Sequence, residues 1–263
     1  MKKLLALFVI LGMFICSTSA FADVSLKDVS DAMSNLSISS VNLAFDADLK
    51  VSISIEGMDM SFPVTAKVDM KFADMLANGN MSVNVSGLFD QPIESEFYMA
   101  ITDNSIDVFA QDENGDWQTT STDLDTPIDF DALNVPLNFG DKATLEESGD
   151  RIVVRDTLGD LMAMNGLTDD DIKELQEYAG DYAELAQEIL TFMENTEIVF
   201  EFDKDFVPVS VSMNDMDFKA NIDGTDMILS GSISCEYSDV NSVDSFEIPE
   251  DIIQNAVVFS VDE

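Results

Sequence analysis

The side chains that could do chemistry in this sequence are almost all carboxylates. The 263 residues include 52 Asp and Glu, 12 Lys and Arg, two Cys and no His, so the formal net charge is 12 − 52 = −40 at pH 7. A Ser-His-Asp triad, a Cys-His pair and a histidine-based zinc site all need an imidazole, so none of them can be assembled. Nucleic acid is bound through clustered Lys and Arg, and we therefore expect no nucleic-acid partner.

A glycosidase needs only a pair of carboxylates, so the positions of the acidic residues decide whether such a pair is expected. Most of them alternate with apolar residues, as Asp46 and Asp48 do, and in that phase a strand directs them to solvent. The sequence also has no Asp-Thr-Gly or Asp-Ser-Gly run of the aspartic-protease type. We predict no catalytic residues and no enzymatic activity.

Calcium is the ion that suits a carboxylate-rich chain best, because it prefers oxygen ligands. Asp112, Asn114 and Asp116 have alternating ligand spacing, but Trp117 stands where an EF-hand needs Gly, and position twelve is Asp123 instead of Glu. This pattern favours a hairpin tip over a dedicated site. We predict no metal site and no cofactor.

The 15 Met raise the alternative of a copper site built from thioether pairs such as Met58 and Met60. Most of the others, including Met70, Met81 and Met99, follow the apolar phase of predicted strands. That phase favours a core or a cavity lining. Flexible Met together with Phe also suits a pocket that accepts apolar chains of varied shape.

The first 22 residues have the pattern of a signal peptide. Two lysines precede the apolar run Leu4–Ile15, and Ala20 and Ala22 provide a small-residue cleavage site. We predict a signal peptide over residues 1–22 and a single domain over residues 23–263, secreted or in the cell envelope outside the cytoplasmic membrane. An uncleaved anchor is the alternative, although the run is shorter than the roughly 20 residues that span a bilayer. No later run is long enough, so no transmembrane span is predicted after cleavage.

The two cysteines fit export without adding a disulfide. Cleavage would leave Cys235 alone, in an alternating segment where it is expected to be a small buried hydrophobic residue. Cys16 raises the alternative of a lipoprotein acylated at that position. Ile15 disfavours it, because the bacterial lipobox needs a small residue there.

The period of the apolar residues sets the order of the elements. A capping box formed by Ser25 and Asp28 predicts a short helix, and alternation then predicts long strands over 41–55 and 60–72. The Asn78-Gly79 pair predicts a hairpin turn before the next strand. Further strands complete a six-stranded antiparallel meander up to Trp117 and Thr119.

The second half repeats the order of helix followed by strands. A helical segment is predicted at about 157–195, with its long helix from Asp169 to Asn195. Alternation resumes from Ile198 to Tyr237, and the chain is predicted to end with a short strand at 246–248 and one or two helical turns.

Several local features resemble the lipoprotein-carrier half-barrel superfamily of LolA and LppX type, and most closely its uncharacterised secreted bacterial members. They are the leading helix, the hairpin Asn114–Trp117, the mid-chain helix, the turn from Asp203 to Pro208, and Ile248–Glu250 near the end. The resemblance implies an α+β fold, in which a curved antiparallel sheet (a half-barrel) packs around one long and one or two short helices. It also implies an apolar cavity for acyl chains.

Two function classes follow. The first is an exported protein that binds a lipid or another apolar small molecule between the sheet and the helices. Its candidate ligand-binding residues are Phe45, Leu49, Phe62, Met99 and Leu185. The second is a non-enzymatic acidic envelope module, whose interior is filled by side chains and whose surface binds a basic protein partner, cell-wall material or calcium weakly.

Overall fold

A computed structural model describes most of the chain. The described residues are 24–36, 38–55, 58–102, 105–112, 114–123, 137–165, 183–222 and 225–258. The predicted signal peptide lies outside them, as do residues 166–182 of the predicted helical segment.

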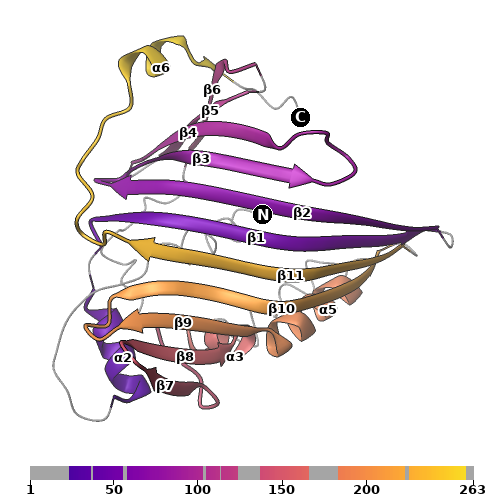
Figure 1. Cartoon of the computed structure of the whole chain (residues 1–263), viewed down its shortest axis with the longest axis vertical. Helices are drawn as coiled ribbons and strands as arrows, with labels where there is room; N and C mark the ends of the chain where they lie inside the picture. Colours follow the sequence, from indigo (N-terminus) through magenta and orange to yellow (C-terminus); the bar gives the residue numbers. More distant parts are fainter. Residues whose placement is uncertain are drawn as a thin grey trace.

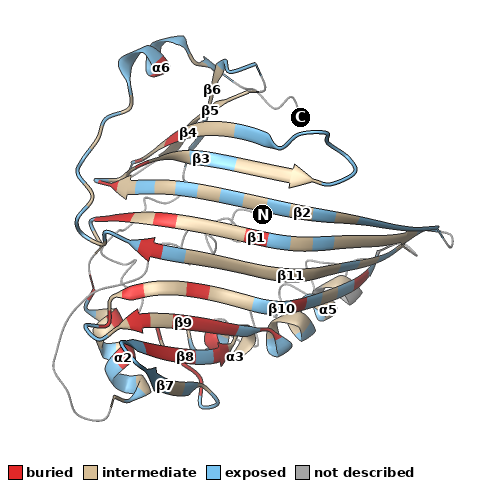
Figure 2. Ribbon diagram, in the orientation of Figure 1, coloured by how far each residue is buried: buried red, intermediate tan, exposed pale blue. Residues whose placement is uncertain are grey.

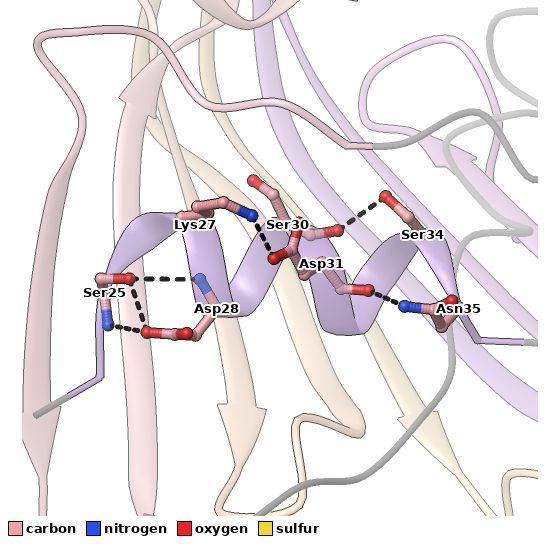
Figure 3. A network of polar contacts seen from close by, with 7 residues as sticks. All are labelled: Ser25, Lys27, Asp28, Ser30, Asp31, Ser34 and Asn35. Carbon is pink, nitrogen blue, oxygen red and sulfur yellow. Dashed lines mark hydrogen bonds and ion pairs between the residues drawn. The ribbon is translucent and has the colours of Figure 1, made fainter. Parts of the chain in front are cut away.

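Helix α2 (Leu26–Ser34) begins at the predicted capping box (Figure 3). The Asp28 main-chain N–H donates to Ser25 Oγ at 3.3 Å, and the Ser25 main-chain N–H donates to Asp28 Oδ2 at 2.8 Å. These two bonds close the capping box at the helix N-terminus, where the Asp28 N–H also donates to the Ser25 carbonyl oxygen at 3.0 Å. One face of α2 carries Val29 and Met33, which are buried in the core against the sheet.

In the described part of the chain, twelve strands form one open, curved, largely antiparallel sheet (Figure 1). The strands are β1 Ser40–Ile55, β2 Met58–Ala73, β3 Leu76–Val85, β4 Ile93–Ile101, β5 Ser105–Gln111, β6 Trp117–Asp123, β7 Thr144–Ser148, β8 Arg151–Thr157, β9 Glu197–Asp203, β10 Pro208–Ile222, β11 Thr225–Ser238 and β12 Val257–Val258. The described ranges also contain the helices α3 Leu158–Met164, α5 Ala183–Asn195 and α6 Glu250–Asn255. The α+β half-barrel fold class is thereby confirmed.

The sheet consists of two meanders that meet at β1. Strands β1 to β6 lie side by side in chain order, as predicted, and β7 to β11 form a second run in chain order. The two runs join where β11 pairs antiparallel with β1, from Asn42↔Ser238 to Ser54↔Asp226. This pairing makes β1 an interior strand with a partner from each half of the chain.

The two faces of the sheet differ because side chains alternate along each strand. We call the face that contacts α3 and α5 the apolar face. Residues directly opposite one another share a face, so the register places apolar side chains in continuous cross-strand rows. One such row contains, from β8 to β2, Val154, Phe200, Val211, Cys235, Phe45 and Val68. The other face carries mostly polar side chains, including Asp46, Lys67 and Ser234.

The most deeply buried core lies at the β7–β11 end of the sheet, beneath the helices (Figure 2). Val154, Ile198 and Phe202 are almost fully buried there. Helix α5 packs on β10 through Phe192 and Phe218, whose ring centroids are 5.5 Å apart. The prediction that the mid-chain helix lies on the dry face of the sheet is confirmed for its described part.

The predicted hairpin turn at Asn78-Gly79 is wrong. The chain turns at Asp74 and Met75, whose φ angles are 51° and 67°, and β3 then runs through Asn78 and Gly79. Gly79 is needed in the strand, because a Cβ built on it would lie 2.2 Å from the carbonyl oxygen of Asp69 on β2. The glycine therefore permits a close approach between strands, and the turn forms earlier in the chain.

The chain end also differs from its prediction. Residues 246–248 form no strand, whereas the predicted helical turns are present as α6. After α6, Val257 and Val258 form β12, which pairs in parallel with Gln118 and Thr119 of β6. A strand of two residues is too short to show the alternation of apolar and polar residues by which a strand is recognised in a sequence.

Gly231 on β11 generates a stability prediction. Its φ of +138° is disfavoured for other residues, and an added Cβ would lie 2.1 Å from the carbonyl oxygen of Asp48. Backbone strain and overlap together should make Gly231→Ala destabilising by about 3 kcal/mol or more in urea denaturation.

Gly115→Ala is the matched control, because that glycine also has positive φ, +82°, but has open space around it. It should cost only about 1–2 kcal/mol. Equal losses would show that the close approach at Gly231 is unimportant.

Candidate functional site

The sheet brings four of the five predicted ligand-binding residues to one face. Phe45 and Leu49 on β1, Phe62 on β2 and Met99 on β4 all project from the apolar face, and each is half-buried. Leu185 lies on α5 and is also half-buried. Their shared face agrees with the expected lining, and their role in binding stays a prediction.

Phe62 lies in a cross-strand row of apolar side chains that reaches helix α5, where an apolar ligand could be contacted from both the sheet and the helix. Its directly opposite neighbour is Val51 on β1, which is opposite Leu229 on β11, and Leu229 is opposite Phe218 on β10. Phe192 of α5 packs edge-on against Phe218, at an interplanar angle of 77°. The row thus leads from the open half of the sheet to the helix, over about 14 Å at ~4.8 Å between neighbouring strands.

The neighbouring row toward the middle of the strands has a gap in its apolar side chains. Val64, Leu49, Gly231 and Met216 are in register there, so the glycine leaves no side chain between Leu49 and Met216. A β-bulge between Met213 and Met216 bends β10 beside this point. Both methionines face the apolar side, in agreement with the core or lining role predicted for most of the methionines.

Met99 belongs to another part of the face. It lies opposite Ala77, in the row that continues through Phe72 to Val41. Val41 and Val51 are ten residues apart on β1, which places Met99 about 34 Å along the strand direction from the row of Phe62. The five predicted residues therefore lie along an extended apolar band and do not form a compact pocket.

Sequence reasoning missed Val51, Leu229, Phe218 and Phe192 as neighbours of Phe62. Each lies in the apolar phase of its own strand or helix, and this signal is readable from the sequence. Their alignment depends on the pairing of β1 with β11, and alternation within a strand does not contain that information.

The Asp112 carboxylate accepts hydrogen bonds from within its own hairpin tip. Asp112 Oδ1 accepts main-chain N–H groups from Asn114 at 2.8 Å and Asp116 at 3.0 Å, and Oδ2 accepts from Gln118 Nε2 at 3.2 Å. The main-chain bonds from Asp116 and then Asn114 lower the pKa of Asp112 below its usual value. This geometry is that of a hairpin tip, the interpretation that the sequence favours.

The described residues contain neither a group of candidate metal ligands nor a helix suited to crossing a membrane. Within them, no three Asp, Glu or Cys side chains are grouped closely enough to hold a metal ion. Among the helices of those same ranges, none is long and apolar enough to cross a bilayer.

Cys235 lies in the apolar row, between Phe45 on β1 and Val211 on β10. Burial in this row raises the pKa of its thiol above the usual value, and Tyr237 partly opposes that shift through a hydrogen bond. A raised pKa keeps the sulfur protonated near neutral pH, which makes it a poor nucleophile. The arrangement agrees with a structural cysteine.

Comparisons with known proteins identify a family without an assigned function. The model described as "Family of unknown function (DUF6612)" matches residues 25–257. No curated protein matches the chain. Among solved structures, a porin-like protein from Bacteroides uniformis ATCC 8492 is 11% identical, with 76% of this chain and 97% of that chain covered and a TM-score of 0.22. A DUF1329 family protein from Desulfovibrio piger ATCC 29098 is 9% identical, with 81% and 88% covered and a TM-score of 0.20.

The environment of Cys235 predicts slow alkylation. In the chain that starts at Asp23, Cys235 is the only thiol. Its reaction with iodoacetamide at pH 8 should be several-fold slower in the folded protein than in urea, because less thiolate is present and access is restricted. The rate in the folded protein should also keep rising at pH values where the rate in urea has levelled off, since its thiol pKa is raised. Equal rates in both states would contradict the assignment.

Proposed function

We propose that this chain, which belongs to the DUF6612 family, is an exported envelope protein that holds an apolar ligand between its sheet and helix α5. The ligand class is a long, flexible hydrocarbon such as the acyl chain of a lipid. The candidate contacts are those predicted from the sequence, namely Phe45, Leu49, Phe62, Met99 and Leu185, together with Val51, Leu229 and Phe218. In this proposal the protein is a carrier or sensor and not an enzyme.

One observation carries the proposal. The apolar rows continue across β1, β2 and β3, whereas the described contacts of α5 with the sheet are to β10 and β8. Side chains such as Phe62, Val64 and Val83 are consequently only half-buried, although they share a face with the core. A band of aligned apolar side chains offers continuous contact to a linear ligand, and Gly231 leaves a space between Leu49 and Met216 in its middle.

The free energy of burying hydrocarbon is large enough to support an acyl chain as the ligand. Each CH₂ that is fully removed from water contributes about 0.8 kcal/mol. A dissociation constant below 1 mM needs about 4 kcal/mol net, after the cost of lost translational and rotational freedom. A chain of a dozen or more CH₂ groups can offset that cost by burial alone, so the site needs no charged contact to bind it.

The resemblance to LolA- and LppX-type lipoprotein carriers points in the same direction, since their half-barrels enclose acyl chains. The signal-peptide pattern of residues 1–22 supports export. Fold analogy alone does not assign a function, so the apolar band remains the main support.

Substitution of Phe62 tests the proposal. A fluorescent fatty acid should bind the folded protein with a submillimolar dissociation constant, and Phe62→Asp should weaken binding at least about tenfold, because a carboxylate would have to be desolvated beside the chain. Ser61→Asp is the matched control, since it adds the same charge one residue away on the polar face of β2. Its affinity should be unchanged within about twofold.

Native mass spectrometry of the exported protein, before and after lipid extraction, provides an independent readout. A mass difference that extraction removes is the expected result. If neither the fatty acid nor extracted bacterial lipid binds, the carrier function is refuted and the acidic interaction module replaces it.

A further inference from the structure

The β1–β2 hairpin extends past β3, which leaves part of β2 at an open edge of the sheet. Pairing between β2 and β3 reaches Val64↔Val85, and the Ser86 main-chain N–H then donates to the Pro63 carbonyl oxygen at 2.9 Å. Beyond this point, residues 58–62 of β2 pair only with β1 in the described part of the chain. Figure 1 shows the hairpin projecting beyond the end of β3. We call residues 58–62 the β2 edge.

The bond from Ser86 to Pro63 fixes which main-chain groups face outward along the β2 edge. Successive residues of an antiparallel strand direct their N–H and C=O groups to alternate sides. Asp59 and Ser61 therefore direct theirs to the same side as Pro63, away from β1. The N–H and C=O of both residues line the open edge, which is a template for pairing with another polypeptide.

The side chains at this end of the sheet are unusually apolar for an exposed surface. On the β2 edge, Met58 is 65% and Met60 41% exposed, and both project from the apolar face. In the adjoining β3–β4 loop, Leu88 is 61% and Phe89 46% exposed. Large exposed apolar side chains that gather beside an open strand edge mark an interaction surface.

The charged side chains of the β2 edge, the β3–β4 loop and the start of β4 are all acidic. Asp59, Asp90 and Glu94 are exposed there. The sequence contains no Lys or Arg between Lys71 and Lys142, a stretch that includes all of β3 and the β3–β4 loop. Lys50, opposite Pro63 on β1, is a cation on the same polar face. A partner that pairs here meets three carboxylates and one ammonium group, so charge complementarity selects a basic partner.

Self-association through the same edge is opposed by charge. Two copies paired at their β2 edges would bring two Asp59 side chains together, and each chain carries a net charge of −40. Repulsion of that size disfavours a symmetric dimer. The same argument disfavours an anionic membrane surface.

We propose that the β2 edge binds an extended polypeptide segment in which apolar and basic side chains alternate, adding it to the sheet as a further strand. The N–H and C=O groups of Asp59 and Ser61 hold its main chain. Its apolar side chains lie on Met58 and Met60, and its basic side chains lie toward Asp59 on the polar face. The β2 edge adjoins the acyl-chain band at Phe62, but its main-chain contacts are those of Asp59 and Ser61, so this proposal does not depend on the proposed function.

A labelled peptide tests the proposal on the folded protein. The probe is a fluorescent octapeptide of alternating Val and Lys, and its binding is followed by fluorescence anisotropy. Ser61→Pro removes an N–H from the open edge, so it should raise the dissociation constant at least about tenfold. Pro63 already occupies the equivalent phase of the same strand, so the fold should accept the change. Ser61→Ala is the matched control, because it keeps the main-chain N–H and should bind like the parent protein.

A second variant keeps the test decisive if Ser61→Pro fails to fold. Asp59→Lys should weaken binding of the Val and Lys peptide and strengthen binding of the corresponding Val and Glu peptide. Equal affinity of the parent protein for both peptides would overturn the proposal, as would full binding by a folded Ser61→Pro variant. A concentration-dependent dimer of the parent protein that Ser61→Pro abolishes would also overturn it, in favour of self-pairing. Fatty-acid binding by Ser61→Pro should be unchanged, which separates this test from that of the proposed function.

Discussion

The pairing of β1 with β11 is the constraint on which the rest of the structure depends. It joins residues that are far apart in sequence, since Ser54 and Asp226 are 226 − 54 = 172 positions apart. Forming such a pair costs loop-closure entropy before any burial offsets it. In return it merges two meanders, each with one apolar face, into a single sheet with continuous apolar rows. Without this pairing β1 and β11 would both be long exposed edges.

The register of that pairing is fixed by burial. A slip of one residue would move the apolar side chains of β11 to the polar face and bring serines such as Ser232 and Ser234 to the apolar face. Gly231 adds a second restriction, because only glycine can approach the backbone of Asp48 so closely. The same contact and the bulge in β10 lie beside Leu49, so the features that fix the register also shape the middle of the candidate site.

Local patterns predicted the elements much better than they predicted the contacts between them. Alternation identified β1 and β2 almost to their ends, and the capping box identified the start of α2, because both signals lie within a few residues of sequence. The turn at Asp74 and Met75 was missed because Met at positive φ carries no turn signal, whereas Asn78-Gly79 carries a strong one but is used for strand contact. The row from Phe62 to Phe218 was missed for a different reason. It crosses β1 and β11, whose register is a property of the whole fold.

The uneven distribution of burial explains how a chain with so much negative charge can keep an apolar face available. Side-chain packing holds the described part of the fold together, and Cys235, the cysteine within it, is free. That packing is concentrated at β7 to β11, where Val154 and Ile198 are almost fully buried and α2, α3 and the segment around Phe139 close the core. Because this end supplies a complete core, the apolar side chains of β1 to β3 need not be covered in order to hold the fold together. The carboxylates on the opposite face keep such a sheet in solution, since mutual repulsion opposes association between copies. In the proposed function, the fold is therefore stabilised mainly at β7 to β11, and the apolar side chains left available for a ligand lie mainly on β1 to β3.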